Sequence, residues 1–78
     1  MNSKEIGPFA VRELTVGEGL PLLKIMTEDT NKFQNELVLA CTTKDGKPVK
    51  ELPFSELIPH MGDIIVEAMR INGFLDKE

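Results

Sequence analysis

Residues 20–26 have the sequence LPLLKIM, in which five of seven side chains are large and apolar and one is charged. A surface helix of a small domain normally buries one apolar stripe and turns its other sides to water. This segment carries apolar residues on more than one side. The sequence therefore predicts a helix with more apolar surface than one packing face covers.

The residues before this segment predict where its helix begins. Thr15 and Glu18, in the sequence TVGE, have the spacing of a capping box, in which each side chain accepts a hydrogen bond from a free amide at the helix start. We expect the helix to run to about Thr27. Pro21 predicts either a bend or a regular part that begins near Pro21 itself, because a proline inside a helix removes a hydrogen-bond donor.

A second helix is expected after EDTN, where Asp29 or Thr30 is a suitable N-cap. Residues 36–43 allow a rival interpretation as a strand, which would form a hairpin around Asp45-Gly46 with KPVK. We favour the helix, because the cap and the spacing of Phe33 from the later apolar residues both support it.

Helical projection at about 100° per residue divides the apolar side chains of these two helices into a core stripe and a surplus. The predicted core stripes are Val16, Leu20, Leu23 and Met26 in the first helix, and Phe33, Leu37, Ala40 and Cys41 in the second. The surplus is Leu22, Ile25, Val38 and Leu39.

The rest of the chain has weaker signals and one clear helix. Residues 1–7 are expected to be a flexible lead-in, PFAVRELT a short strand, PFSEL a helical turn, and residues 76–78 a tail. The last helix starts at about Pro59 and stops at Asn72-Gly73. Its apolar arc is Met61, Ile64, Ile65, Ala68, Met69 and Ile71.

Together these elements predict a mainly α fold. It is a three-helix small domain over residues 8–75, with a short N-terminal β-strand and the hairpin near Asp45-Gly46 as an alternative. A chain of 78 residues has room for one core and is marginally stable alone. Cys41 is the only cysteine, which excludes a disulfide within the chain, and one His with one Cys does not make a closed metal site. We therefore expect self-association or a partner to supplement the core.

Charge and hydropathy exclude several function classes. Thirteen acidic and nine basic residues give a net charge of −4, with no basic stripe of the kind that nucleic-acid binders carry. No run approaches the ~20 apolar residues of a membrane span, and MNSKEIGPFA lacks the apolar region of a secretory signal. We expect a cytoplasmic protein that contacts neither nucleic acid nor membrane.

The residues with reactive side chains do not form a catalytic pattern. Cys41 lies among apolar residues, where a thiol is usually inert packing, and His60 follows Pro59 at a helix start, a common surface position. Asp63 and Glu67 have the i, i+4 spacing of a solvated helix face. We therefore expect no enzymatic activity, no cofactor and no metal.

The surplus apolar residues are the candidates for partner binding. Leu22, Ile25, Val38 and Leu39 are predicted to contact a client or a second copy, with Phe74 and Leu75 as further candidates. In the alternative, three short helices wrap one another so fully that both faces of each are buried.

The order of segments resembles the small tail assembly chaperones of long-tailed phages and prophages. The similarity covers about residues 8 to 74 and lies in FAVRELTVGEGLPLLKIM, FQNELVLACTTKDGKPV and the closing AMRINGF. The resemblance implies a mainly helical, self-associating protein without enzymatic activity or cofactor. Its implied partner is the tape measure protein, which it would bind in the host cytoplasm before the tail tube forms.

Two other functions are compatible with the same residues. One is a structural tail subunit, which would remain in the finished virion. The other is a small acidic regulator that binds a host protein, which would favour acidic residues gathered on one face. Here the acidic residues are scattered through caps and loops.

Overall fold

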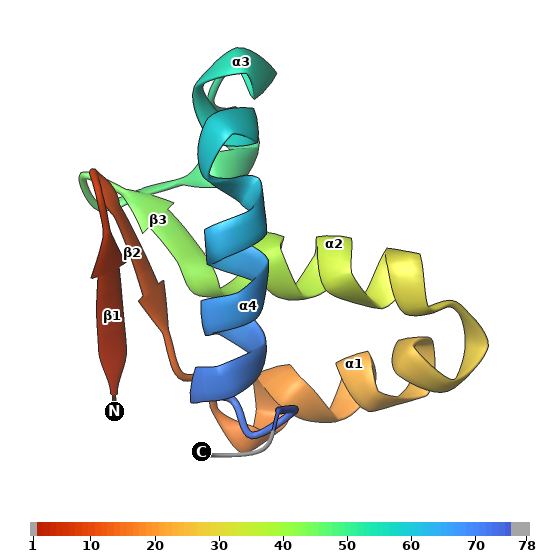
Figure 1. Ribbon diagram of the computed structural model, residues 1–78. Helices are drawn as coiled ribbons and strands as arrows, with labels where there is room; N and C mark the ends of the chain where they lie inside the picture. Colours follow the sequence, from red (N-terminus) through yellow and green to blue (C-terminus); the bar gives the residue numbers. More distant parts are fainter. Residues whose placement is uncertain (1, 76–78) are drawn as a thin grey trace.

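The computed structural model describes residues 2–75, which form an antiparallel sheet packed against helices (Figure 1). The fold is a mixed α/β domain, so the prediction of a mainly α fold with a single strand is wrong. In chain order the elements are β1 (Ser3–Ile6), β2 (Phe9–Arg12), α1 (Val16–Glu28), α2 (Thr30–Cys41), β3 (Thr42–Lys44), β4 (Lys47–Pro48), the 3-10 turn η1 (Val49–Glu51), α3 (Phe54–Leu57), the 3-10 turn η2 (Ile58–His60) and α4 (Met61–Ile71).

The four strands lie in the order β1-β2-β3-β4, and every neighbouring pair is antiparallel. β1 and β2 are joined by a two-residue turn at Gly7-Pro8, in which Gly7 has a φ of +56°. Residues 3–6 therefore form an edge strand, and the flexible lead-in predicted for residues 1–7 is wrong there. The sequence did not reveal β1, because three of its four side chains are exposed and the strand lacks an apolar alternation.

The second hairpin turns at Asp45-Gly46, where both residues have positive φ, +52° and +80°. Two-residue hairpins favour turns with positive φ at both central positions, which Asp-Gly and Asn-Gly accommodate. The hairpin expected here as an alternative is thus confirmed. The strand is shorter than that alternative required, because α2 stays helical as far as Cys41.

α1 and α2 form a helical hairpin inserted between β2 and β3 (Figure 1). The capping box is confirmed: Glu18 N–H donates to Thr15 Oγ1 at 3.2 Å, and Thr15 N–H donates to Glu18 Oε1 at 3.0 Å. The helix begins at Val16 and continues through Pro21. Asp29 caps the start of α2, accepting from Lys32 N–H at 3.1 Å.

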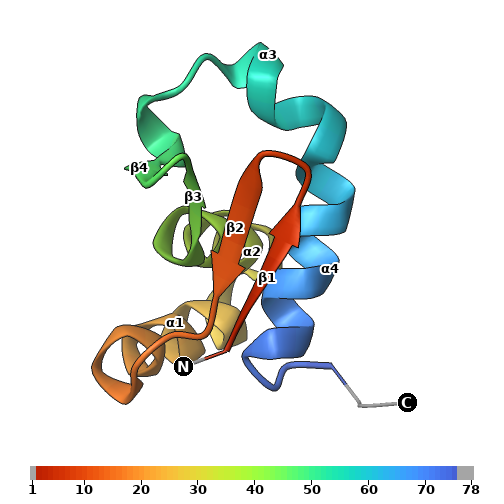
Figure 2. The same cartoon turned by 90° about the vertical axis from the view of Figure 1, so that its left-hand side faces the viewer.

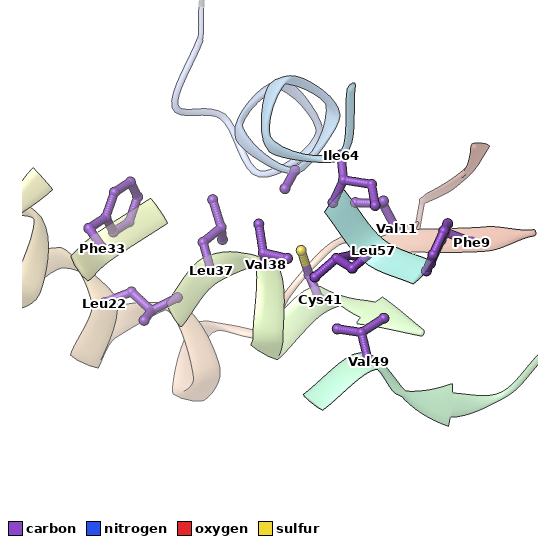
Figure 3. Packing of buried hydrophobic residues seen from close by; sticks show 11 residues of the cluster. Phe9, Val11, Leu22, Phe33, Leu37, Val38, Cys41, Val49, Leu57 and Ile64 are labelled. Carbon is purple, nitrogen blue, oxygen red and sulfur yellow. The ribbon is translucent and has the colours of Figure 1, made fainter. Parts of the chain in front are cut away.

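The core lies between the sheet, α2 and α4 (Figure 2). Phe9 and Val11 of β2 point toward these helices, while Ala10 and Arg12 lie on the other sheet face. Figure 3 shows the packed side chains. Ile64 and Ala68 are fully buried, and Met61, Ile65, Met69 and Ile71 pack at the edge of the core, which confirms the apolar arc predicted for α4.

The end of α4 also follows the sequence prediction. Asn72 is the C-cap and Gly73 has a φ of +86°, a conformation that favours glycine. Phe74 N–H donates to Met69 O at 2.8 Å, and Gly73 N–H donates to Arg70 O at 3.2 Å, the pattern of a Schellman motif. The chain thereby turns back, and the Phe74 ring meets that of Phe33 edge-on, with centroids 4.9 Å apart. The tail predicted for residues 76–78 lies outside the described residues.

Candidate protein-binding surface

The structure does not bring the six predicted partner-binding residues onto one surface. Leu22 and Val38 belong to the hydrophobic core. Ile25 and Phe74 are half-buried and pack against that core. Leu39 and Leu75 are exposed. Leu22 and Val38 therefore offer a partner almost no exposed surface, although Val38 also lines the groove described below.

The faces of α1 are largely the reverse of those predicted, although Met26 of the predicted core stripe is half-buried and packs against the core. Leu22 packs inward (Figure 3), whereas Val16, Leu20 and Leu23 of the predicted core stripe are 76%, 59% and 41% exposed. α1 packs mainly against α2, and it does so with the side that carries Leu22. Helical projection separates the faces of a helix but does not say which of them meets its neighbour.

The buried arc of α2 is wider than the predicted stripe. α2 packs against α1 and also against α4, so Val38 is buried along with Phe33, Leu37 and Cys41. Ala40, which was predicted to be in the core, is exposed. Leu39 is the one surplus residue of this helix that reaches the surface.

Leu39 lines an open apolar groove between α2 and the segment from η1 to α4, which we call the α2–α3 groove. The groove has a volume of about 520 Å³, and eight of its ten lining residues are apolar. The lining residues are Asn35, Val38, Leu39, Val49, Lys50, Leu52, Phe54, Leu57, Ile58 and Met61.

Within the α2–α3 groove, buried and exposed side chains have different places. Val38, Val49 and Leu57 line the groove but belong to the core and are almost fully buried. Phe54, Ile58 and Leu39 are 68%, 49% and 41% exposed. Three large, exposed apolar side chains line this one groove, which distinguishes them from isolated surface apolar residues.

Contacts on either side of α3 hold the groove wall in place. Lys44 Nζ of β3 donates to Glu56 Oε1 at 2.8 Å and lies 5.9 Å from the centre of the Phe9 ring. By accepting this hydrogen bond, the Glu56 carboxylate raises the pKa of Lys44. His60, just after α3, packs against Phe9 with ring centroids 5.1 Å apart. The wall is thus fastened to the sheet.

A second apolar area lies on α1, and we call Val16, Gly19, Leu20 and Leu23 the α1 face. These residues line a groove of about 250 Å³ together with Leu14, Thr15, Asn72 and Phe74. Sequence analysis missed this surface, because it assigned its aliphatic residues to the core. The residue that could have indicated an exposed surface was Gly19, because a glycine within a core-facing stripe contributes no side chain to the packing.

The residues considered for catalysis lie apart from both surfaces. Cys41 is buried, burial raises the pKa of its thiol, and its polar neighbour is Thr42 Oγ1 at 3.8 Å. Glu67 is paired with Arg70 at 2.9 Å, and Asp63 is exposed. Within residues 2–75, no group of three or more His, Cys, Asp or Glu side chains is placed to hold a metal ion. No helix in this part of the chain is both long and apolar enough to cross a membrane.

Compared with protein-family models, with curated proteins and with solved structures, the chain matches none of them. The two apolar surfaces and the sequence resemblance are therefore the grounds for assigning a function.

Proposed function

We propose that the protein is a non-enzymatic tail assembly chaperone of a long-tailed phage or prophage. In this proposal it binds the tape measure protein in the host cytoplasm before the tail tube forms. The observation that carries the proposal is the α2–α3 groove, which is open, almost entirely apolar and surrounded by the exposed side chains of Phe54, Ile58 and Leu39. The resemblance of residues 8–74 to this family supports the same function.

The chemistry of the groove favours an apolar helix as its occupant. An amphipathic helix binds in a groove by inserting side chains spaced three and four residues apart, and it satisfies its own backbone. Lys50 is the one charged lining residue, so the groove offers few groups that would recognise a polar ligand. A long client with apolar helix faces supplies such segments repeatedly, and a net charge of −4 suits a basic client.

The size of the exposed patch predicts reversible binding. Full burial of one large apolar side chain contributes about 1.5–3 kcal/mol. The exposed fractions of Phe54, Ile58 and Leu39 sum to about one and a half side chains, which corresponds to about 2–5 kcal/mol. Micromolar affinity requires about 8 kcal/mol, so the client's own side chains must supply the remainder. Such a complex can form during assembly and release its client afterwards.

The test is co-purification of the protein with a tape measure protein from the same phage or prophage genome. Ile58→Asp and Phe54→Asp place a charge at the groove, and we expect each to reduce client recovery at least tenfold while thermal unfolding stays within a few degrees of wild type. Val66→Asp is the matched control. The side chain of Val66 is 44% exposed, a fraction similar to that of Ile58, and Val66 does not line the groove.

Client recovery that is unchanged in Phe54→Asp and Ile58→Asp, or reduced equally by Val66→Asp, would contradict the proposal. Mass spectrometry of purified virions separates the chaperone from a structural tail subunit, because only the subunit remains in the finished particle. Recovery of a host protein in place of the tape measure protein would favour the acidic regulator.

A further inference from the structure

Asn72 is the one asparagine of the chain that precedes a glycine. At such a pair the backbone nitrogen of the glycine attacks the side-chain amide of the asparagine readily, because no side chain on the glycine obstructs the approach. This reaction is one reason why asparagine counts among the thermolabile residues. Whether the pair reacts in the folded chain depends on how the fold holds the two reacting groups.

Three hydrogen bonds hold the side-chain amide of Asn72. Its Oδ1 accepts from Leu14 N–H at 2.7 Å, and its Nδ2 donates to Ala68 O at 2.9 Å and to Arg12 O at 3.4 Å. The amide thus lies half-buried between the end of α4 and the connection from β2 to α1. It cannot turn toward the following backbone nitrogen without breaking these bonds.

The attacking nitrogen of Gly73 is held away from the amide as well. Asn72 has a ψ of 7°, so the Gly73 nitrogen eclipses the backbone nitrogen of Asn72 and does not lie on the side of Cβ. Ring closure onto Cγ requires the nitrogen on the Cβ side. Gly73 N–H also donates to Arg70 O at 3.2 Å, and the Schellman motif keeps its peptide group in this orientation. The folded end of α4 therefore keeps the two reacting groups apart.

We propose that Asn72 is a hydrolytic modification site that reacts when the end of α4 opens, and that its product cannot restore the connection to α1. In the open state the Gly73 nitrogen loses its proton and bonds to Asn72 Cγ, and the Cγ–Nδ2 bond breaks. Nδ2 takes up a proton and leaves as ammonia. Water then opens the cyclic imide, at Cγ to give aspartate or at the backbone carbonyl carbon to give isoaspartate. Water is the only co-reactant.

Neither product fits the site as asparagine does. The carboxylate of aspartate still accepts from Leu14 N–H, but it has no donor for Ala68 O and Arg12 O. Two carbonyl oxygens then face a negative charge in a partly buried place, which is unfavourable. In isoaspartate the main chain runs through the side-chain carbon, which lengthens the turn after α4. A single reaction therefore loosens this end of the helix permanently.

Phe74 is the residue that controls how often this end opens. Its half-buried ring packs against the core and meets Phe33 edge-on, with centroids 4.9 Å apart. Gly73 is exposed, and a Cβ built there meets nothing within 4 Å, so water reaches the pair once the turn unwinds. Helix ends open locally at a lower cost than the whole domain unfolds. The reaction rate of Asn72 should therefore follow the packing of Phe74.

Peptide mapping of the full chain by mass spectrometry, after incubation at about pH 8 and 37 °C, tests the site. We expect Asn72 to deamidate at least about tenfold more slowly in the folded protein than in the chain unfolded in urea. Phe74→Ala should speed deamidation of the folded protein at least about threefold, and Phe74→Leu, which keeps an apolar side chain, should speed it less. Phe54→Ala is the matched control, because Phe54 is 68% exposed and belongs to α3. It should leave the rate unchanged.

The effect of the product is measured with a variant that carries it from the start. Asn72→Asp should lower the melting temperature by at least about 4 °C. Asn35→Asp is the control, since it adds the same charge at an exposed position of α2. It should change the melting temperature by less than about 3 °C.

Three results would overturn the inference. They are equal deamidation of Asn72 in the folded and the unfolded chain, equal rates in Phe74→Ala and Phe54→Ala, and an Asn72→Asp variant as stable as Asn35→Asp. The site does not involve the client groove, so this inference and the proposed function can fail independently. Phe54→Asp should lose the client and deamidate at the wild-type rate.

Discussion

Leu14 and Asn72 are 58 positions apart in the chain, and the Leu14 N–H donates a hydrogen bond of 2.7 Å to Asn72 Oδ1. The same amide group donates from Nδ2 to Ala68 O at 2.9 Å and to Arg12 O at 3.4 Å. One side chain therefore fastens the end of α4 to the connection between β2 and α1. It fixes the position at which α1, and with it the α1 face, begins.

Replacing Asn72 with alanine should lower the free energy of unfolding by about 1–3 kcal/mol, because Leu14 N–H loses its partner in a partly buried place. For a domain of this size each kcal/mol corresponds to a fall in melting temperature of about 4–8 °C. Urea unfolding followed by circular dichroism measures the change. Asn31→Ala, at an exposed position in α2, is the control. A loss below about 0.5 kcal/mol in Asn72→Ala would show that the connection is held by other contacts.

The reversed faces of α1 give a direct comparison between two leucines of one helix. Leu22→Ala should cost about 2–5 kcal/mol, since Leu22 is 6% exposed and its removal leaves a cavity in the core. Leu20→Ala should change the unfolding free energy of the monomer by less than about 1 kcal/mol, because Leu20 is 59% exposed. The measurement is chemical unfolding at a low protein concentration. Equal losses of unfolding free energy in the two variants would show that Leu20 is buried, as the sequence predicted, and that the α1 face is not an exposed surface.

Local signals in the sequence predicted the local features of the fold correctly. The capping box at Thr15 and Glu18 and the stop at Asn72-Gly73 depend on residues within a few positions of one another. The turn at Asp45-Gly46 is local in the same sense. Residue type and spacing suffice for such features, because the hydrogen bonds involved close within one turn.

Features that depend on distant neighbours were predicted poorly. β1 is polar and exposed, and it becomes a strand by pairing with β2 through a two-residue turn. The buried face of α1 depends on its packing against α2. The α2–α3 groove is lined by Leu39 of α2 and by Phe54 and Ile58 of a later segment. A helical projection treats one segment at a time, so it cannot place these residues together. Both candidate surfaces therefore required the tertiary structure.

The ion pair at the start of α1 should make stability depend on pH. The hydrogen bond from Arg12 and the amide of Thr15 lower the pKa of Glu18 from 4.5 to about 2. Between these values the unfolded chain binds a proton that the folded chain does not, so the free energy of unfolding falls as the pH drops from about 4.5 to 2. Above pH 4.5 the contribution of the pair is fully present.

Glu18→Gln tests this dependence. The variant should be less stable than wild type at pH 6, and the difference should shrink toward pH 2 and in 1 M NaCl, because the pair is exposed and screened by salt. Thermal unfolding at several pH values measures it. Glu28→Gln, which removes the same charge from the other end of α1, controls for net charge. A difference that stays constant from pH 6 to 2 would show that Glu18 acts through the neutral hydrogen bonds of the capping box alone.

The buried thiol should report on opening of the core. Cys41 is 1% exposed, and burial raises the pKa of its thiol, which reduces the reactive thiolate at neutral pH. We expect a disulfide-exchange reagent at pH 8 to label the folded protein at least tenfold more slowly than the chain in urea. Leu22→Ala, which loosens the packing of α1 on α2, should speed labelling of the folded state, because opening becomes less costly. Leu20→Ala should leave the rate unchanged. Rapid labelling of the wild-type folded protein would mean that the junction of α2 and β3 opens to solvent, which would contradict the packing of Cys41 within the core.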